Sequence, residues 1–285
     1  MAEREGLFTR EGLNVKVVIP IPGGSDKMID ALNDDWADVT HIATPYLIRS
    51  ALAGSDAVAI ASEFRNPIYS LIAKPEIQTF ADLTGKVIGF ADESGTISIS
   101  MRRLLTMHGL NRGDFIAKVE EGTPARLSCL RRGVCDAVVL GQPQDLQAIA
   151  DGYRLLGRSD EVVSNFLYTV TAARRSWAAS HKDTLVPYLR AMASAFASIR
   201  DPSNRNRVVK IIAETSGSSE IVAAQTLDLI LQHDALPNRG EISIAGLNEV
   251  IAMMSGAGLL KPPPPQAQNF IDLQYLRAAG IQQVN

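Results

Sequence analysis

Short apolar runs alternate with segments of helical periodicity along the first two thirds of the chain. The runs are rich in β-branched residues, and turn residues bound most of them, which is typical of strands. Strands that alternate with helices indicate mainly parallel sheets, so we expect an α/β fold. The runs expected to be strands are Val15–Ile19, Ala37–Ile42, Ala57–Ala61, Tyr69–Ala73, Val87–Phe90, Phe115–Val119, Val134–Leu140 and Asn165–Ala172.

Helices are predicted where apolar residues recur every three to four positions. Thr44-Pro45 is a typical helix start, with Thr as the N-cap and Gly54 as the stop. The stripe from Ile97 to Leu105 predicts another helix, which ends at Gly109. Further helices are expected over Asp183–Ile199, Arg205–Glu214, Ser219–Leu231, Ile244–Ala257 and a last amphipathic segment that carries Phe270 to Leu276, after a stiff connector of four prolines.

Composition limits the classes of function. Of the 285 residues, 46% are hydrophobic and 21% are charged, which indicates a globular chain with a large core. A net charge of −3 with no basic cluster argues against nucleic-acid partners. No apolar run approaches the length of a membrane span, and the first residues do not resemble a secretory signal. Cys129 and Cys135 are expected to be free buried thiols, and their spacing does not indicate a metal site.

Polar residues gather where predicted strands lead into helices, the edge at which open α/β sheets bind ligands. The four loops contain Ser25 with Gly24, His41 to Thr44, Ser94-Gly95-Thr96, and Thr123. Unsatisfied N–H groups at helix starts favour negatively charged ligands. Ser and Thr are also ordinary caps, so each loop taken alone favours a purely structural role.

Four segments resemble, in order, the substrate-binding proteins of ABC importers for nitrate, sulfonate, taurine and thiamine precursors. They are Gly6-Leu7-Phe8-Thr9-Arg10-Glu11-Gly12-Leu13-Asn14-Val15, Asp38-Val39 with Ala53-Gly54, Asp82-Leu83-Thr84-Gly85-Lys86-Val87-Ile88-Gly89, and Arg132-Gly133-Val134-Cys135-Asp136-Ala137. The resemblance implies a two-lobed type II periplasmic-binding fold with a helical C-terminal part, which closes on a small solute. Family members place a further strand before the first segment, so the first strand is expected to be missing here.

The resemblance also implies a division of the chain and a set of binding residues. Residues 1–73 and 171–285 would form one lobe and 74–170 the other, with the ligand cleft between them. The residues expected to line this cleft are Gly24, Ser25, His41, Thr44, Ser94, Gly95, Thr96, Thr123, Gly141 and Gln142. The implied partners are an ABC permease and its ATPase, the implied location is periplasmic, and the chain is expected to be a monomer without cofactor or metal.

Several residues near the predicted cleft allow two interpretations. Tyr69 and Tyr168 could form walls for an aromatic ligand or pack in the core. Asp92 and Glu93 flank the Ser94 loop, and they would repel a highly charged anion, which favours a monoanionic or neutral solute.

Two other classes of function remain open. A few enzymes share this fold, including thiamine-pyrimidine synthases and a desulfinase that uses a cleft cysteine. The sequence contains no Gly-x-Ser-x-Gly elbow, no phosphate-binding loop and no His-Glu-x-x-His pair. A ligand-sensing receptor domain would use the same cleft. We therefore expect a solute-binding protein for a small carboxylate, sulfonate or heteroaromatic ligand, and not an enzyme.

Overall fold

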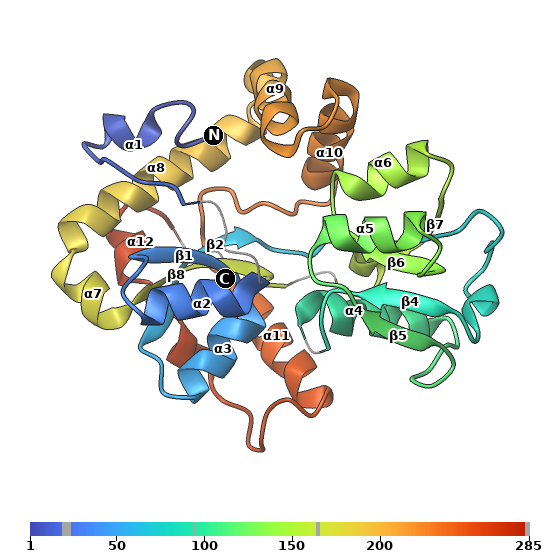
Figure 1. Ribbon diagram of the computed structural model, residues 1–285. Coiled ribbons are helices and arrows are strands. Elements are labelled where there is room, and N and C mark those ends of the chain that lie inside the picture. Colours follow the sequence, from blue (N-terminus) through green and yellow to red (C-terminus); the bar gives the residue numbers. More distant parts are fainter. Residues whose placement is uncertain (19–23, 94, 164–165, 283–285) are drawn as a thin grey trace.

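The computed structural model describes residues 1–18, 24–93, 95–163 and 166–282. Its strands form two separate sheets, which lie side by side in Figure 1. The first sheet has the order β1 (Val39–Ala43), β8 (Thr169–Arg174), β2 (Ala57–Phe64). The second has the order β5 (Ile116–Val119), β4 (Val87–Phe90), β6 (Ala137–Leu140), β3 (Ser70–Ala73), β7 (Arg154–Arg158).

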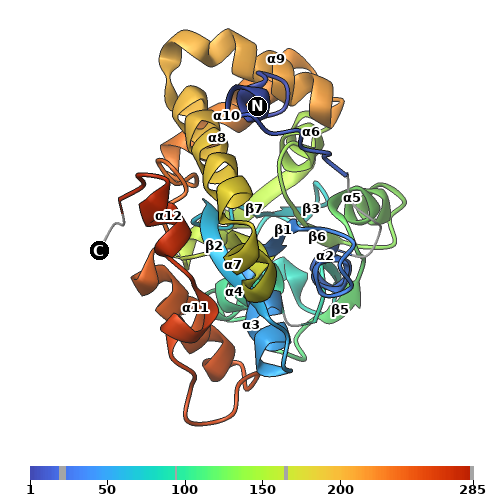
Figure 2. The same cartoon turned by 90° about the vertical axis from the view of Figure 1, so that its left-hand side faces the viewer.

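Most helices belong, together with the first sheet, to the first lobe. They are α1 (Leu7–Arg10), α2 (Gly24–Asn33), α3 (Thr44–Leu52), α7 (Arg175–Ser180), α8 (Lys182–Arg200), α9 (Arg205–Ser216), α10 (Glu220–Gln232), α11 (Ile244–Gly256) and α12 (Gln274–Ala278). Figure 2 shows the long α8 crossing this lobe. The second lobe contains the second sheet with α4 (Thr96–Met107), α5 (Thr123–Arg131) and α6 (Gln144–Ala150). Short 3₁₀ turns complete the lobes, η1 (Ala81–Leu83), η2 (Ser159–Glu161), η3 (Pro202–Asn204) and η4 (Ala267–Phe270).

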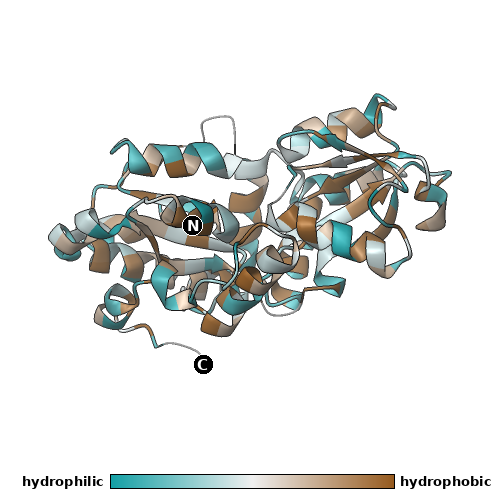
Figure 3. Ribbon diagram, turned by 90° about the horizontal axis from the view of Figure 1, so that it is seen from below, coloured by the Kyte–Doolittle hydropathy of each residue, from teal (hydrophilic) through white to brown (hydrophobic). Residues whose placement is uncertain are grey.

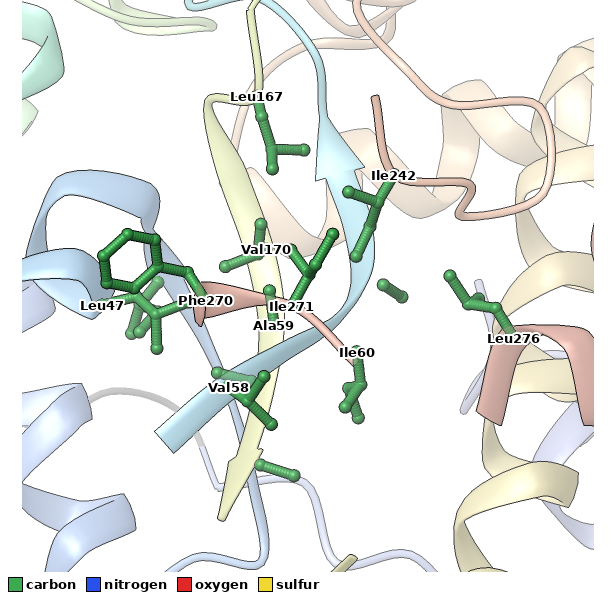
Figure 4. Packing of buried hydrophobic residues seen from close by; sticks show 14 of the residues in the cluster. Leu47, Val58, Ala59, Ile60, Leu167, Val170, Ile242, Phe270, Ile271 and Leu276 are labelled. Atoms are coloured by element: carbon green, nitrogen blue, oxygen red, sulfur yellow. The ribbon is translucent and has the colours of Figure 1, made fainter. Parts of the chain in front are cut away.

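Each lobe has its own buried apolar core. Around the first sheet, side chains of α3, β2 and β8 pack against residues from the end of the chain, and Ala59 of β2 bridges to Ile271 (Figure 4). The second sheet is covered on its two faces by separate clusters, one with α4 and the other with α5 and α6. Figure 3 shows apolar residues concentrated along the strands of both lobes. Two cores of this kind are typical of two lobes that can move relative to each other.

Two segments connect the lobes. Residues 65–69 lead from β2 to β3, and residues 159–168 lead back towards β8. We call them the connecting segments. The lobe boundaries expected at 73 and 171 lie a few residues from the points at which the chain passes from one sheet to the other. Strand β3 belongs to the second sheet, and β8 joins the first sheet from Thr169 onward.

The expected mainly parallel sheets were also wrong. Both neighbours of β8 run antiparallel to it, so the whole first sheet is antiparallel. In the second sheet β4 is parallel to β5 and β6, whereas β3 is antiparallel to β6 and β7. The cause is the same in both lobes. The strand that follows each connecting segment, β3 or β8, inserts between two strands that a helix links.

Three expected elements differ in the structure. Residues 15–18 form no strand, and Val17 and Val18 are each 48% exposed; Ile19 lies outside the described residues. The final helix is broken into η4, an extended residue and α12. Cys129 and Cys135 are not free thiols but form a disulfide that ties the end of α5 to the approach to β6.

Candidate functional site

The connecting segments are bonded to each other, and each carries a tyrosine. Ser159 accepts a hydrogen bond from the backbone N–H of Tyr69 at 2.9 Å and donates one to the carbonyl oxygen of Pro67 at 2.6 Å. The hydroxyl groups of Tyr69 and Tyr168 lie 3.2 Å apart, and their rings meet edge to face. Burial and the neighbouring Tyr69 raise the pKa of Tyr168 well above 10. Both phenols are therefore fixed at the junction of the lobes.

Helix α3 begins against the second connecting segment. Thr44 is the first residue of the helix, not its N-cap as expected, and the N-cap position is held by Ala43. The Thr44 hydroxyl donates to the carbonyl oxygen of Leu167 at 2.6 Å, and its backbone N–H donates to that of Tyr168 at 3.0 Å. Thr44 is completely buried. It therefore anchors helix α3 to the second connecting segment, and its hydroxyl proton is used in the hydrogen bond to Leu167.

The loop between β4 and α4 makes a contact across the two lobes. Asp92 accepts a hydrogen bond from the Tyr46 hydroxyl of α3 at 2.9 Å and one from the backbone N–H of Gly95 at 2.6 Å. A Cβ at Gly95 would lie 2.2 Å from a carboxylate oxygen of Asp92, so a larger residue here would displace that carboxylate. Burial and the Asp92 charge raise the pKa of Tyr46, which keeps the phenol protonated as the donor.

Helix α4 starts with a buried hydroxyl that has no partner among the described residues. Thr96 is 1% exposed, and its Oγ1 makes no hydrogen bond there. A buried hydroxyl in this state is costly unless something binds it. Thr96 was among the expected site residues, whereas its neighbour Ser94 lies outside the described residues.

The start of α5 holds an arginine that the sequence analysis did not single out. The Thr123 hydroxyl accepts a hydrogen bond from Nη2 of Arg126 at 3.1 Å. Arg126 also donates to the carbonyl oxygens of Val139 at 2.5 Å and Glu120 at 2.9 Å. Arg126 is only 2% exposed. The sequence offered one signal for Arg126. This residue follows Thr123 by one helical turn, so the two side chains lie on the same face of α5.

The residues after β6 are held by a buried carboxylate. Gln142 Nε2 and the Ser70 hydroxyl both donate to Oδ2 of Asp145, at 2.9 and 2.7 Å. Gly141 faces the ring of Tyr69, where an added Cβ would lie 2.9 Å from Cε1. Gly141 thus lies next to the junction, and a larger residue at this position would push Tyr69 away.

Helix α2 contributes the expected residues Gly24 and Ser25 at its start. Gly24 has a positive φ of 64°, which favours glycine. The Ser25 hydroxyl accepts a hydrogen bond from the backbone N–H of Ala43 at 3.3 Å, next to the start of α3. This contact places Ser25 on the junction side of the first lobe. The preceding loop residues 22 and 23 lie outside the described residues.

His41 is engaged within the first lobe. Its Nδ1 is paired with Glu63, and its Nε2 lies 3.3 Å from the Tyr188 hydroxyl of α8. Thr171 donates to the same glutamate at 3.0 Å. These contacts join His41 to β2, β8 and α8, and no described contact brings it to the residues of the second lobe.

Five side chains from both lobes therefore interact at the junction, and we call them the junction cluster. The hydroxyls of Tyr69 and Tyr168 meet each other, and Asp92 is bonded to Tyr46. Burial lowers the pKa of Arg126, and the charge of Asp92 raises it. Of the expected site residues, Thr44, Gly95, Thr123 and Gly141 contact members of the cluster directly. The members are Tyr46, Tyr69, Asp92, Arg126 and Tyr168.

A groove of about 910 Å³ also lies between the lobes, between α4 and α11. Arg102, Arg103 and Arg112 contribute one wall, and Met253 and Leu259 belong to the other. Of the expected site residues that the structure describes, none lines it. Among the described residues, no group of three or more His, Cys, Asp or Glu could hold a metal ion. No described helix is long and apolar enough to cross a membrane.

Several solved structures with this fold are ligand-binding proteins. The ligand-binding component of an ABC-type import system from Staphylococcus aureus, with zinc bound, superimposes with a TM-score of 0.78 at 16% identity, over 98% of this chain and 93% of that one. The alkanesulfonate-binding protein SsuA from Xanthomonas axonopodis pv. citri, bound to MOPS, gives 0.75 at 20% identity, over 94% and 91%.

The aliphatic sulphonate-binding SsuA of Escherichia coli gives a TM-score of 0.73 at 21% identity, over 99% of this chain and 88% of that one. At these identities the likeness establishes the shared periplasmic-binding fold. None of the curated proteins matches the sequence. The NMT1-like family matches residues 1–213, which is most of the chain. The protein is therefore a member of the NMT1-like family.

Proposed function

We propose that this protein captures a small organic solute between its lobes and delivers it to an ABC importer. The observation that carries the proposal is the junction cluster, because it draws side chains from both lobes to one place. A solute bound there would contact both lobes at once. Such a solute stabilises the closed arrangement by its differential affinity for the two states. The proposed ligand is a carboxylate, a sulfonate or a heteroaromatic compound.

The mechanism follows from what the junction residues can still bind. Thr96 has a buried hydroxyl without a described partner, and the first N–H groups of α4 and α5 are oriented as in any helix start. These groups would hold the polar head of the solute. The phenyl rings of Tyr69 and Tyr168 would pack against the rest of it. Gly24, Ser25, Gln142 and His41 remain proposed contacts, as does Ser94.

The disulfide supports a location outside the cytoplasm. Cys129 and Cys135 are both fully buried and are joined to each other. Disulfides persist in oxidising compartments such as the periplasm and are rare in the cytosol. A periplasmic location is what an ABC import system requires of its solute-binding subunit. The permease and ATPase are accordingly the proposed partners.

An enzymatic role on this fold is the alternative, favoured by one structural neighbour. A DszB variant in complex with biphenyl-2-sulfinic acid superimposes with a TM-score of 0.70 at 15% identity, over 98% of this chain and 94% of that one. A cysteine nucleophile requires a free thiolate. The two cysteines of this chain are consumed by the disulfide. Binding without thiol chemistry is therefore the function we propose.

A thermal-shift screen tests the proposal directly. The purified protein is melted with carboxylates, sulfonates, nitrate, pyrimidines and aromatic acids, and binding to the folded state raises Tm. We expect at least one class to raise Tm, and isothermal titration to confirm one site per chain. The screen is then repeated with Tyr69→Ala, which should lose the shift. A cooperative melt that no compound changes would contradict the proposal.

A further inference from the structure

Arg126 is a buried cation without a carboxylate partner. The residue is 2% exposed, and among the residues that the structure describes it takes part in no ion pair. Its acceptors are two backbone carbonyl oxygens and one threonine hydroxyl, all of them neutral. Buried arginines are ordinarily paired with an acid, because removing an unpaired charge from water is costly. Arg126 therefore has no neutralising partner among the described residues.

The hydrogen-bonding capacity of Arg126 is also only partly used. A guanidinium group carries five N–H donors in a fixed plane. Three hydrogen bonds are formed, one each from Nε, Nη1 and Nη2. One N–H on Nη1 and one on Nη2 therefore have no acceptor among the described residues. A group that accepts two hydrogen bonds and carries a negative charge would complete the set.

The neighbouring acid does not complete it. Asp92 is the carboxylate that acts electrostatically on Arg126, but one of its oxygens is bonded to Tyr46 and the other to Gly95. The remaining neighbours are the hydroxyl groups of Tyr69 and Tyr168, which are neutral and bonded to each other. Nothing in the junction cluster neutralises Arg126 by direct contact.

We propose that Arg126 is the charge-recognising residue of the solute site and that the solute carries an anionic head, such as a carboxylate or sulfonate. This inference rests on the proposed function, and it excludes the neutral heteroaromatic ligands which that function would also allow. The acid group of the solute binds the free N–H donors of Arg126. Thr123 orients the guanidinium from the first turn of α5.

A purely structural role would make different predictions. If Arg126 only ties the end of β5 and the strand β6 to α5, its replacement lowers stability but leaves the preference for anions unchanged. If Arg126 binds the solute, its replacement removes that preference. Anion preference therefore separates the two roles, whereas stability does not.

The first experiment uses small anions as probes and needs no knowledge of the natural solute. Tm is measured in saturating formate or methanesulfonate and compared with chloride at equal ionic strength. We expect both probes to raise Tm of the wild type and to have no effect on Arg126→Gln. Arg132→Gln is the matched control, because it removes the same charge from the exposed end of the same helix. Arg126→Lys keeps the charge and should retain part of the response, which guards against a folding defect in the glutamine variant.

The second experiment compares acids with their neutral amides by isothermal titration. The pairs are benzoate with benzamide and ethanesulfonate with ethanesulfonamide. We expect the acid that binds to lose about 10- to 100-fold in affinity in Arg126→Gln, the size of a hydrogen bond to a charged group. Amides that bind as tightly as acids would overturn the inference while leaving the proposed function intact. A wild type that responds neither to formate and methanesulfonate nor to any acid or amide would overturn both.

Discussion

Removing the Tyr46 hydroxyl should open the ligand-free protein. The hydrogen bond from Tyr46 to Asp92 spans 2.9 Å and joins α3 of the first lobe to the β4–α4 loop of the second. Both side chains are half-buried, so the bond to the carboxylate contributes about 1 to 1.5 kcal/mol, below the range for fully buried charged pairs. Tyr46→Phe keeps the ring and loses only this bond. The ratio of closed to open molecules should therefore fall about 5- to 12-fold.

Interlobe distances provide the assay. Spin labels on Asp34→Cys and Arg132→Cys report from exposed positions on opposite lobes, and the native disulfide is fully buried and stays unlabelled. In the phenylalanine variant the distance distribution should shift to longer values without solute and return when a saturating solute is added. Tyr153→Phe removes a phenol hydroxyl from the second lobe alone and should change nothing. A distribution in Tyr46→Phe identical to the wild type would refute the reasoning.

Three further predictions concern stability. Replacing both Cys129 and Cys135 by serine should lower the free energy of unfolding by about 2 kcal/mol in urea, the value for a loop of this length; an unchanged urea midpoint would contradict it. Glu241→Gln should lower the stability of the protein at pH 7, and the stabilities of the variant and the wild type should converge in acid. Burial alone would raise the pKa of Glu241, but backbone N–H groups and an arginine hold that pKa below 4.5. The stabilisation by Glu241 is therefore lost as the pH falls through its lowered pKa. Gly246→Ala should lower Tm, because its Cβ would lie 2.7 Å from main-chain atoms of the second connecting segment, whereas Gly256→Ala on the same helix meets nothing within 4 Å and should raise Tm slightly.

Local patterns predicted most elements, because their signals lie within a few residues. The run Val87–Phe90 coincides with β4, and Thr44-Pro45 marks the start of α3. Strand order could not be predicted in this way. The position of β8 between β1 and β2 depends on pairing between residues more than a hundred positions apart. Strand β7 was missed because its run Arg154–Arg158 begins and ends with arginine and has only two consecutive leucines.

Sequence reasoning pointed to the loops of the candidate site and to Asp92, but it did not single out Arg126. Hydroxyl and glycine residues at helix starts follow from capping rules, which is why Thr96 and Gly95 were expected near the junction. No comparable rule predicts the burial of Arg126, because an arginine inside a helix is usually exposed. Arg126 is buried against the carbonyl groups of Glu120, just after β5, and Val139 in β6. Their positions depend on the tertiary fold and cannot be predicted from local sequence. Thr44 shows the converse, because a predicted cap became an anchor once the second connecting segment packed against it.

In the proposed site, the two charges of the junction cluster would also set the preferred charge of the solute. Arg126 can neutralise one negative charge, while Asp92, which both Tyr46 and Gly95 hold in place, repels any second one. Methanesulfonate and sulfate have similar tetrahedral heads but carry one and two charges. Methanesulfonate should therefore bind more tightly at equal ionic strength, and Asp92→Asn should narrow the difference by weakening the repulsion. Equal affinities in the wild type, or a difference that Asp92→Asn leaves unchanged, would show that this carboxylate does not act on the bound anion.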